Sequence, residues 1–196
     1  MHVFIVYTHP SEDSFTRHVR DEFIRGLDDS GHTYELSDLY KMDFRTDISE
    51  AEYLRESNYR DEIPPPDDVL KEQEKINNCD VLVFIYPLFW TEAPAKLVGW
   101  FDRVWTYGFA FGESTMKRLK KALLFCVTGN TIEDLREHGL LESMKKVMLG
   151  DRIYDRAESK EMIVLDGTTK HKPEQRQKNW ERHLERVYAT AGSLND

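Results

Sequence analysis

Val81-Leu-Val-Phe-Ile-Tyr86, which ends at Pro87, is the strongest strand signal in the chain. Its apolar and aromatic residues do not alternate with polar ones, as is typical of a strand that helices cover on both faces. Four further runs also predict strands, at residues 3–7, 33–36, 122–127 and 162–165. Runs of this kind indicate a buried parallel sheet.

Helical patterns separate the predicted strands. Phe15, Val19, Phe23 and Leu27 recur every four positions, which places them on one face of a helix. This alternation of strand and helix predicts an α/β fold in three layers, with helices on both faces of a five-stranded parallel sheet. We expect the strand order 2-1-3-4-5 and a single domain over residues 1–196. Further helices are predicted around residues 69–76, 94–105, 132–149 and 173–188.

Residues 41–66 interrupt the alternation. This segment is polar, carries the run Pro64-Pro-Pro66 and predicts at most one short helix, around residues 49–56. A connection of this length is uncommon in a compact domain unless it has a function or is disordered.

The composition excludes several classes of partner. A formal net charge of −9 argues against duplex nucleic acid or an anionic membrane surface. The longest apolar stretch, residues 81–90, is about half of the ~20 residues that a membrane span needs. Cys79 and Cys126 lie in or beside apolar runs, as buried thiols of a reduced protein do. These two observations predict a soluble, cytoplasmic protein. No residues are spaced as metal ligands, so we expect no metal site.

Three loops should border the ligand site. In an open parallel sheet, ligands bind beyond the carboxyl ends of the strands, where the strand order reverses. In the expected order this crevice lies between the first and third strands, next to residues 8–15, 87–94 and 128–131. Ser14 precedes a helix whose free amides can bind an anion, although a simple helix cap explains Ser14 equally. His9 is the only candidate cation before Arg17.

The second loop is unusually apolar for a loop. Pro87-Leu-Phe-Trp-Thr-Glu-Ala-Pro94 places large aromatic side chains outside a strand end, where polar residues are the norm. Burial in the core suits Leu88, but Phe89 and Trp90 together gain little from exposure. A flat aromatic ligand lying against the loop would account for them.

Two longer stretches resemble the central motif of the NAD(P)H dehydrogenase (quinone) family. They are Phe84-Ile-Tyr-Pro-Leu-Phe-Trp90 and Ala93-Pro-Ala-Lys-Leu-Val-Gly-Trp-Phe-Asp-Arg-Val104, and Tyr107-Gly-Phe-Ala-Phe-Gly112 is similar to the aromatic turn of the family. The resemblance covers residues 1 to about 130 and implies a flavodoxin-like fold. It also implies an activity, in which NAD(P)H reduces a bound flavin that passes two electrons to a quinone or similar electrophile.

The resemblance further implies which residues hold the flavin. They are His9, Ser14 and Phe15 at the phosphate, Pro87, Leu88, Phe89 and Trp90 against the isoalloxazine ring, and Thr128, Gly129 and Asn130 on its far side. FAD is favoured over FMN, because the excursion at residues 41–66 resembles that of the larger family members.

A homodimer is also implied, in which Phe111 helps to wall the substrate pocket of the partner chain. The aromatic crowding of this region agrees with an interface, since aromatic residues are enriched in interface cores. Trp100, Phe101 and Trp105 share one helix, and Tyr107 and Phe109 follow on a loop with Phe111. Filling of the monomer core is the alternative, above all for Phe101.

The third loop departs from the family pattern. The family reads Thr-Gly-Gly there, with a downstream Tyr and His that assist proton movement, whereas Asn130 follows Gly129 here and His138 is the only nearby histidine. A proton-relay role for His138 competes with that of an exposed helical residue. Two other functions stay open: an electron-carrying flavodoxin, and a regulatory flavoprotein subunit of a potassium efflux transporter.

Overall fold

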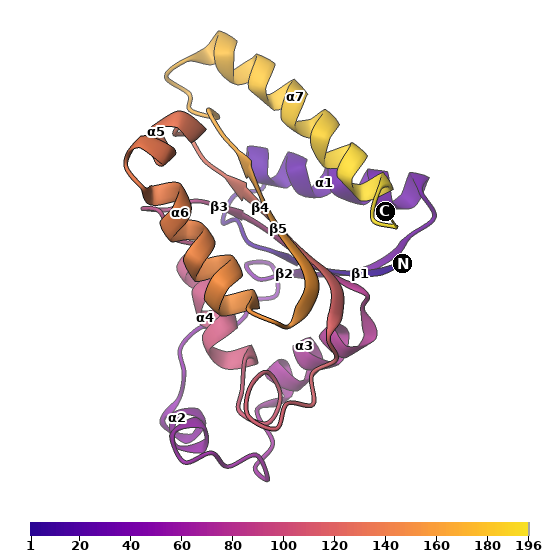
Figure 1. Cartoon of the computed structure of the whole chain (residues 1–196), viewed down its shortest axis with the longest axis vertical. Coiled ribbons are helices and arrows are strands. Elements are labelled where there is room, and N and C mark those ends of the chain that lie inside the picture. Colours follow the sequence, from indigo (N-terminus) through magenta and orange to yellow (C-terminus); the bar gives the residue numbers. More distant parts are fainter. Residues whose placement is uncertain (196) are drawn as a thin grey trace.

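The computed structural model describes residues 1–195, and its strands form one parallel sheet (Figure 1). The sheet order is β2-β1-β3-β4-β5, which confirms the order expected from the sequence. Because β1 pairs with both β2 and β3, the order reverses between β1 and β3. The strands are β1 (His2–Tyr7), β2 (Thr33–Asp38), β3 (Val81–Pro87), β4 (Leu119–Val127) and β5 (Ala157–Leu165).

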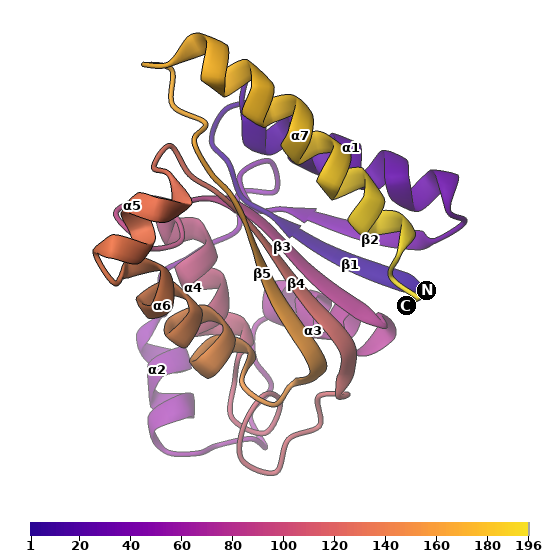
Figure 2. The ribbon, with the colours of Figure 1, turned by 45° about the horizontal axis from the view of Figure 1, so that its top comes forward.

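Helices cover both faces of the sheet, so the fold has the three layers that the sequence predicts. Figures 1 and 2 show α1 (Phe15–Asp29) and α7 (Pro173–Gly192) together on one face. The other face carries α3 (Asp67–Asn78), α4 (Ala95–Val104), α5 (Ile132–Glu137) and α6 (Leu140–Lys145). The apolar face predicted for the first helix is correct, since Phe15, Val19, Phe23 and Leu27 of α1 are all buried.

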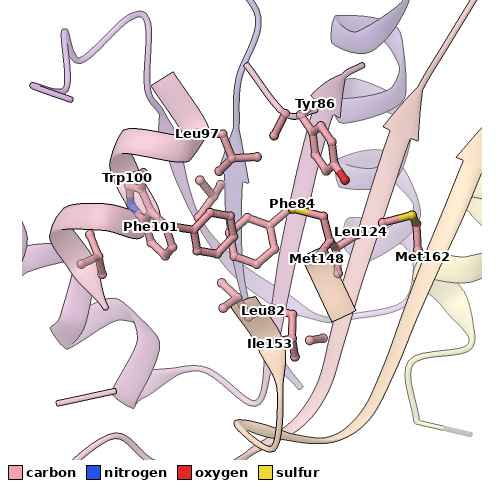
Figure 3. Close-up of a cluster of buried hydrophobic side chains, with 14 of the residues drawn as sticks. Leu82, Phe84, Tyr86, Leu97, Trp100, Phe101, Leu124, Met148, Ile153 and Met162 are labelled. Atoms are coloured by element: carbon pink, nitrogen blue, oxygen red, sulfur yellow. The ribbon is translucent and has the colours of Figure 1, made fainter. Parts of the chain in front are cut away.

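Burial of β3 on both sides explains its unalternated sequence. Val81, Val83 and Ile85 pack in the cluster beneath α1 and α7, whereas Leu82 and Phe84 pack beneath α4. Figure 3 shows the α4 side of the core, where the ring of Phe84 lies 5.0 Å from that of Phe101 between centroids and 5.5 Å from that of Trp100.

The single helical region expected at residues 132–149 is instead three helices. Gly139, with φ 69°, separates α5 from α6, and this left-handed conformation is costly for a residue with a side chain. The third piece is a π-helix, η1 (Lys146–Ile153), after which Tyr154 also has a positive φ of 48°. Such local breaks depend on backbone geometry that the apolar periodicity of the segment does not reveal.

The excursion at residues 41–66 is anchored rather than loose. Its short helix α2 (Glu50–Ser57) begins with a capping box formed by Ser49 and Glu52. Glu52 accepts hydrogen bonds from Arg103 of α4 at 2.7 Å and from Arg45 at 2.5 Å. The segment also contacts α4 so closely that a Cβ at Gly99 would lie 2.5 Å from the Cβ of Thr46. The excursion therefore runs along α4.

Several aromatic residues assigned to a chain–chain interface belong to the core of this chain instead. Trp100 has no exposed surface, and its Nε1 donates to buried Glu72 at 2.9 Å. Phe101 and Phe109 are also buried, and Trp105 is half-buried. The helix α4 can hide the rings of Trp100 and Phe101 because it packs against the sheet and against α3. Tyr107 is also half-buried, so that Phe111 is the only substantially exposed member of the six aromatic residues that the sequence singled out.

Candidate functional site

A cavity of about 450 Å³ opens at the carboxyl ends of β1, β3 and β4. This is the crevice that the strand order predicts, and its size is within the ~300–1,000 Å³ of typical ligand pockets. All three loops named from the sequence contribute to it. Its walls are formed by His9, Ser11, Asp13, Ser14, Phe15, Thr16, Pro87, Leu88, Val127, Gly129, Thr168, Lys170, Arg176 and Trp180.

The first loop brings the start of α1 to the cavity. Ser14 is the N-cap, and its Oγ accepts the N–H of Arg17 at 3.1 Å. The N–H groups of Phe15 and Thr16 belong to the first turn, where a helix has no internal acceptors for them. The hydroxyl of Thr8 is buried without a hydrogen-bond partner among the described residues. Ser14 thus caps the helix, and the free amides beside it suit an anion.

His9 lines the cavity, as the sequence predicts. Burial lowers the pKa of His9, against the opposing effect of a hydrogen bond to the backbone of Ser11. Its Nδ1 lies 3.0 Å from both the nitrogen and the oxygen of Ser11. Burial therefore favours the neutral imidazole, which offers hydrogen bonds to a ligand.

The second loop forms a tight, strained turn. Phe89 and Glu92 exchange two backbone hydrogen bonds of 2.9 Å, and the residues between them, Trp90 and Thr91, have φ values of 52° and 67°. Two-residue turns with positive φ usually contain Asn and Gly, and a bulky residue there is uncommon. Strain of this kind is concentrated at functional sites.

This turn displays its aromatic side chains. Trp90 is 100% exposed and Phe89 is 44% exposed, so the core interpretation of Trp90 is wrong. Pro87 and Leu88 line the cavity, whereas Phe89 and Trp90 stand beyond its walls in the isolated chain. Arg152 of η1 steadies the turn through an ion pair with Glu92 at 3.2 Å.

The third loop closes the far side of the cavity. The N–H of Thr128 donates to Leu165 at 3.0 Å, which continues the pairing of β4 with β5 beyond the strand. Gly129 lines the cavity, whereas Thr128 is buried behind it. Asn130 donates its N–H to Thr128 Oγ1 at 3.2 Å and is not one of the residues in the cavity wall.

A fourth segment, between β5 and α7, contributes to the site although the sequence did not point to it. Thr168, Lys170, Arg176 and Trp180 all line the cavity. Basic and acidic residues alternate along the terminal helix, which is the pattern of a solvated face. The available signal was Trp180, an aromatic residue in the polar first half of this helix. Its ring stacks on Phe15, with 4.5 Å between centroids and 18° between planes.

Two predicted residues lie elsewhere. His138 ends α5, is exposed, and has its Nδ1 2.8 Å from the carbonyl oxygen of Asp134. Phe111 is 41% exposed and lines a separate cavity of about 410 Å³, with Tyr154 and Arg156 in the same wall. Neither residue lines the strand-end cavity of its own chain.

Residues 1–195 contain no group of three or more His, Cys, Asp or Glu side chains placed to hold a metal ion. Within the same residues, none of the helices combines the length and the apolar character that crossing a membrane requires. Cys79 and Cys126 are both buried and unpaired, as expected, and burial raises the pKa of each thiol to about 12.

The sheet order, the strand-end cavity and the helix start that faces it define a ligand-binding, doubly wound α/β protein. Residues 1–190 match the family model described as flavodoxin-like fold, and the chain belongs to this family. This assignment confirms the fold class that the sequence motifs implied.

Individual relatives show to which enzymes the chain is similar. The chain is 43% identical to the NAD(P)H:quinone oxidoreductase from Methanothermobacter marburgensis, whose structure superposes with a TM-score of 0.94 over 100% of this chain and 98% of that one. It is 34% identical to ribosyldihydronicotinamide dehydrogenase (quinone) of Mus musculus over 157 residues, which are 70% of this chain and 68% of that protein. The chain spans about two thirds of the length of the curated relatives that it matches first.

A more distant structure shares the fold alone. General stress protein 14 from Treponema denticola, in complex with FMN, is 23% identical, with a TM-score of 0.71 and 99% of each chain covered. The family match, together with the Methanothermobacter marburgensis and Mus musculus relatives, confirms the resemblance to the quinone dehydrogenases.

Proposed function

We propose that this chain is a flavin-dependent NAD(P)H oxidoreductase that passes two electrons to a quinone or a similar electrophile. The observation that carries the proposal is the meeting of the α1 N-terminus and the apolar residues Pro87 and Leu88 at one strand-end cavity, beside the strained aromatic turn. The 43% identity to an NAD(P)H:quinone oxidoreductase over the whole chain supports the same activity. We assign the whole chain, residues 1–196, to a single flavin-binding domain in the cytoplasm.

The residues at the cavity fit a flavin. An anionic group matches the free N–H groups of Phe15 and Thr16, and a flat ring matches the apolar wall of Pro87 and Leu88. The unpartnered hydroxyl of Thr8 fits the same interpretation, since buried polar groups normally have a partner. A bound flavin supplies the redox chemistry, accepting a hydride from NAD(P)H and giving up two electrons to the acceptor.

The protein would contribute orientation and exclusion of water. Gly129 would place its backbone groups beside the polar edge of the ring, with Asn130 following it in the same loop, and Phe89 with Trp90 would cover the outer side of the ring. The role of His138 as a proton relay stays a prediction. Its hydrogen bond to Asp134 and its exposure are also what an ordinary helix-end histidine shows.

The preference for FAD over FMN stays a prediction, and its basis is weaker than the sequence suggested. It rests on the excursion at residues 41–66, but that segment runs along α4 and contributes no residue to the strand-end cavity. Both flavins share the ring and the first phosphate, which are the parts that the cavity residues fit.

A homodimer with shared sites is part of the proposal. Phe111 is exposed beside its own cavity, and Trp90 is wholly exposed. A second copy that brings Phe111 to the outer side of the aromatic turn would cover both surfaces and complete the substrate pocket. Single exposed apolar residues are normal, but a ligand or a partner chain would account for a fully exposed tryptophan on a strained turn.

Turnover distinguishes this proposal from the two alternatives, which the relatives do not favour. Protein supplied with FAD or FMN should oxidise NADH or NADPH catalytically when a water-soluble quinone is present, and only slowly without it. An electron-carrying flavodoxin would need a separate reductase to become reduced. Flavin-loaded protein that fails to oxidise either nucleotide in the presence of quinone would contradict the enzyme assignment.

A further inference from the structure

The cavity of about 410 Å³ that Phe111 lines is located at the other end of the sheet from the strand-end cavity. Its walls include residues 116–118, which directly precede β4, and residues 154–156, which directly precede β5. The cavity therefore lies at the amino ends of these two strands. Only a second copy of the chain can bring it to a strand-end cavity, as the proposed dimer does.

Three cations line this amino-end cavity: Lys117, Arg118 and Arg156. Among residues 1–195, none of them forms an ion pair with a carboxylate. Arg118 is exposed, and Lys117 donates to the carbonyl oxygen of Cys79 at 2.7 Å. The described wall contains a single acidic residue, Asp155, whereas acidic residues outnumber basic ones by 36 to 27 in the whole chain. The charge of the cavity is thus opposite in sign to that of the chain.

Arg156 is half-buried, whereas the other two cations are exposed. Its Nε donates to the carbonyl oxygen of Ala110 at 3.0 Å, and one of its terminal nitrogens lies 3.4 Å from the carbonyl oxygens of Asp151 and Arg152. These oxygens hold the guanidinium in place but do not neutralise it. Burial lowers the pKa of Arg156, against the opposing effects of Asp155 and Asp151. A bound anion would offset the cost of burying this charge.

Aromatic surface adjoins the three cations. Phe111 is 41% exposed and Tyr154 is 60% exposed, and both lie in the wall of the same cavity. Tyr154 also has a positive φ of 48°, which is costly for a bulky residue, and strain of this kind is concentrated at functional sites. Flat apolar faces beside cations suit a ligand that joins an aromatic ring to an anionic group.

We infer that the electron acceptor is an anionic quinone, whose negative substituent binds the three cations of the amino-end cavity while its ring contacts Phe111. The inference rests on the proposed function, in which Phe111 of one copy walls the substrate pocket of the other. The quinone takes up two electrons and two protons from the reduced flavin and becomes the quinol, and its anionic substituent is unchanged. The cations therefore select which quinones bind.

Two naphthoquinones that differ in charge alone test the inference. One carries a propionate side chain and the other carries the corresponding propionamide, so that the ring and its reduction potential are nearly the same. Flavin-loaded protein is reduced anaerobically with one equivalent of dithionite, and its reoxidation by each quinone is followed by flavin absorbance in a stopped-flow instrument. This design separates the acceptor step from the binding of NAD(P)H, which is itself an anion.

The natural protein should react faster with the carboxylate than with the carboxamide, although a net charge of −9 alone would favour the reverse. Arg118→Gln and Lys117→Gln should each lower the ratio of the two rate constants by about 2- to 5-fold, as expected for the loss of one exposed ion pair. Raising the ionic strength from about 0.01 M to about 0.15 M should also lower the ratio. Lys71→Gln, which changes an exposed lysine of α3 outside both cavities, is the matched control for net charge and should leave the ratio unchanged.

A ratio of one or less in the natural protein, or a ratio that Arg118→Gln and Lys117→Gln leave unchanged, would overturn the inference while leaving the proposed function intact. Equal loss of both rate constants would overturn it as well, because it would show that the side chains shape the cavity without recognising charge. Flavin-loaded protein that neither quinone reoxidises, or protein that retains no flavin, would overturn the proposed function itself. Because Arg118 is exposed, its replacement should leave the fold intact, which an unchanged melting temperature verifies.

Discussion

Replacement of Trp90 by Ala tests whether the exposed turn serves the flavin. Because Trp90 is 100% exposed, the substitution removes no buried surface, and the free energy of unfolding should change by no more than about 0.5 kcal/mol. A core tryptophan would instead cost about 3–5 kcal/mol. Stacking of a heterocyclic base on an aromatic side chain contributes about 1–3 kcal/mol, so the flavin dissociation constant should rise by about 5- to 150-fold.

Trp100→Phe is the opposite control. It should lower the free energy of unfolding by about 1–3 kcal/mol, because buried Glu72 loses the Nε1 donor, and leave flavin affinity unchanged. Urea unfolding of the apoproteins and flavin fluorescence titration measure the two quantities. Trp90→Ala protein that unfolds far more easily yet binds flavin normally would refute the reasoning. If Trp90→Ala changes only the sedimenting mass and leaves flavin affinity unchanged, Trp90 contacts the partner chain and not the flavin.

Two further perturbations test the dimer and the anchored excursion. Sedimentation of the natural protein should give about twice the 23.1 kDa chain mass, and Phe111→Ala should alter the KM for quinone more than flavin retention; a monomer with full turnover would contradict both. Burial would raise the pKa of Glu52, but hydrogen bonds from Ser49, Arg103 and Arg45 outweigh it and lower the pKa to about 2. Relative to the ordinary glutamate pKa of 4.5, this shift corresponds to about 3 kcal/mol of stability, which is present above pH 4.5 and lost as the pH falls towards 2. The difference in urea stability between natural protein and Glu52→Gln should therefore shrink by about half between pH 7 and pH 3, and a difference that stays constant would contradict the assigned ion network.

The sheet was predictable because its strands are buried on both faces. Continuous apolar runs such as residues 81–86 arise when helices cover both sides of a strand. The four-residue spacing from Phe15 to Leu27 arises because one face of that helix packs on the sheet. Backbone detail was not predictable in the same way. Nothing in the periodicity of residues 132–149 separates α5, α6 and the π-helix, since Gly139 acts through its φ angle.

Some features of the site were predictable from the sequence and others were not. The position of the crevice follows from strand order alone, and the aromatic loop was conspicuous because its composition contradicts that of ordinary loops. Arg176 was missed because a cation on a charged helix is the expected pattern for a solvated face, and Lys170 because it lies in the polar segment before that helix. Only the three-dimensional packing of Trp180 on Phe15 shows that α7 reaches the start of α1. Likewise, the partial burial of His9, which lowers the pKa of its imidazole, is a property of the folded chain.

The central claim is that the strand-end cavity holds a flavin, and retention of flavin by the purified protein tests it most directly. Protein incubated with FMN or FAD and then desalted should keep close to one flavin per chain, with the absorbance bands of a bound flavin. These bands should bleach on anaerobic addition of NADH or NADPH and return on addition of a quinone. The melting temperature should rise with flavin concentration, as ligand binding to the native state requires. Protein that retains neither flavin after desalting, and whose melting temperature neither flavin raises, would contradict the account.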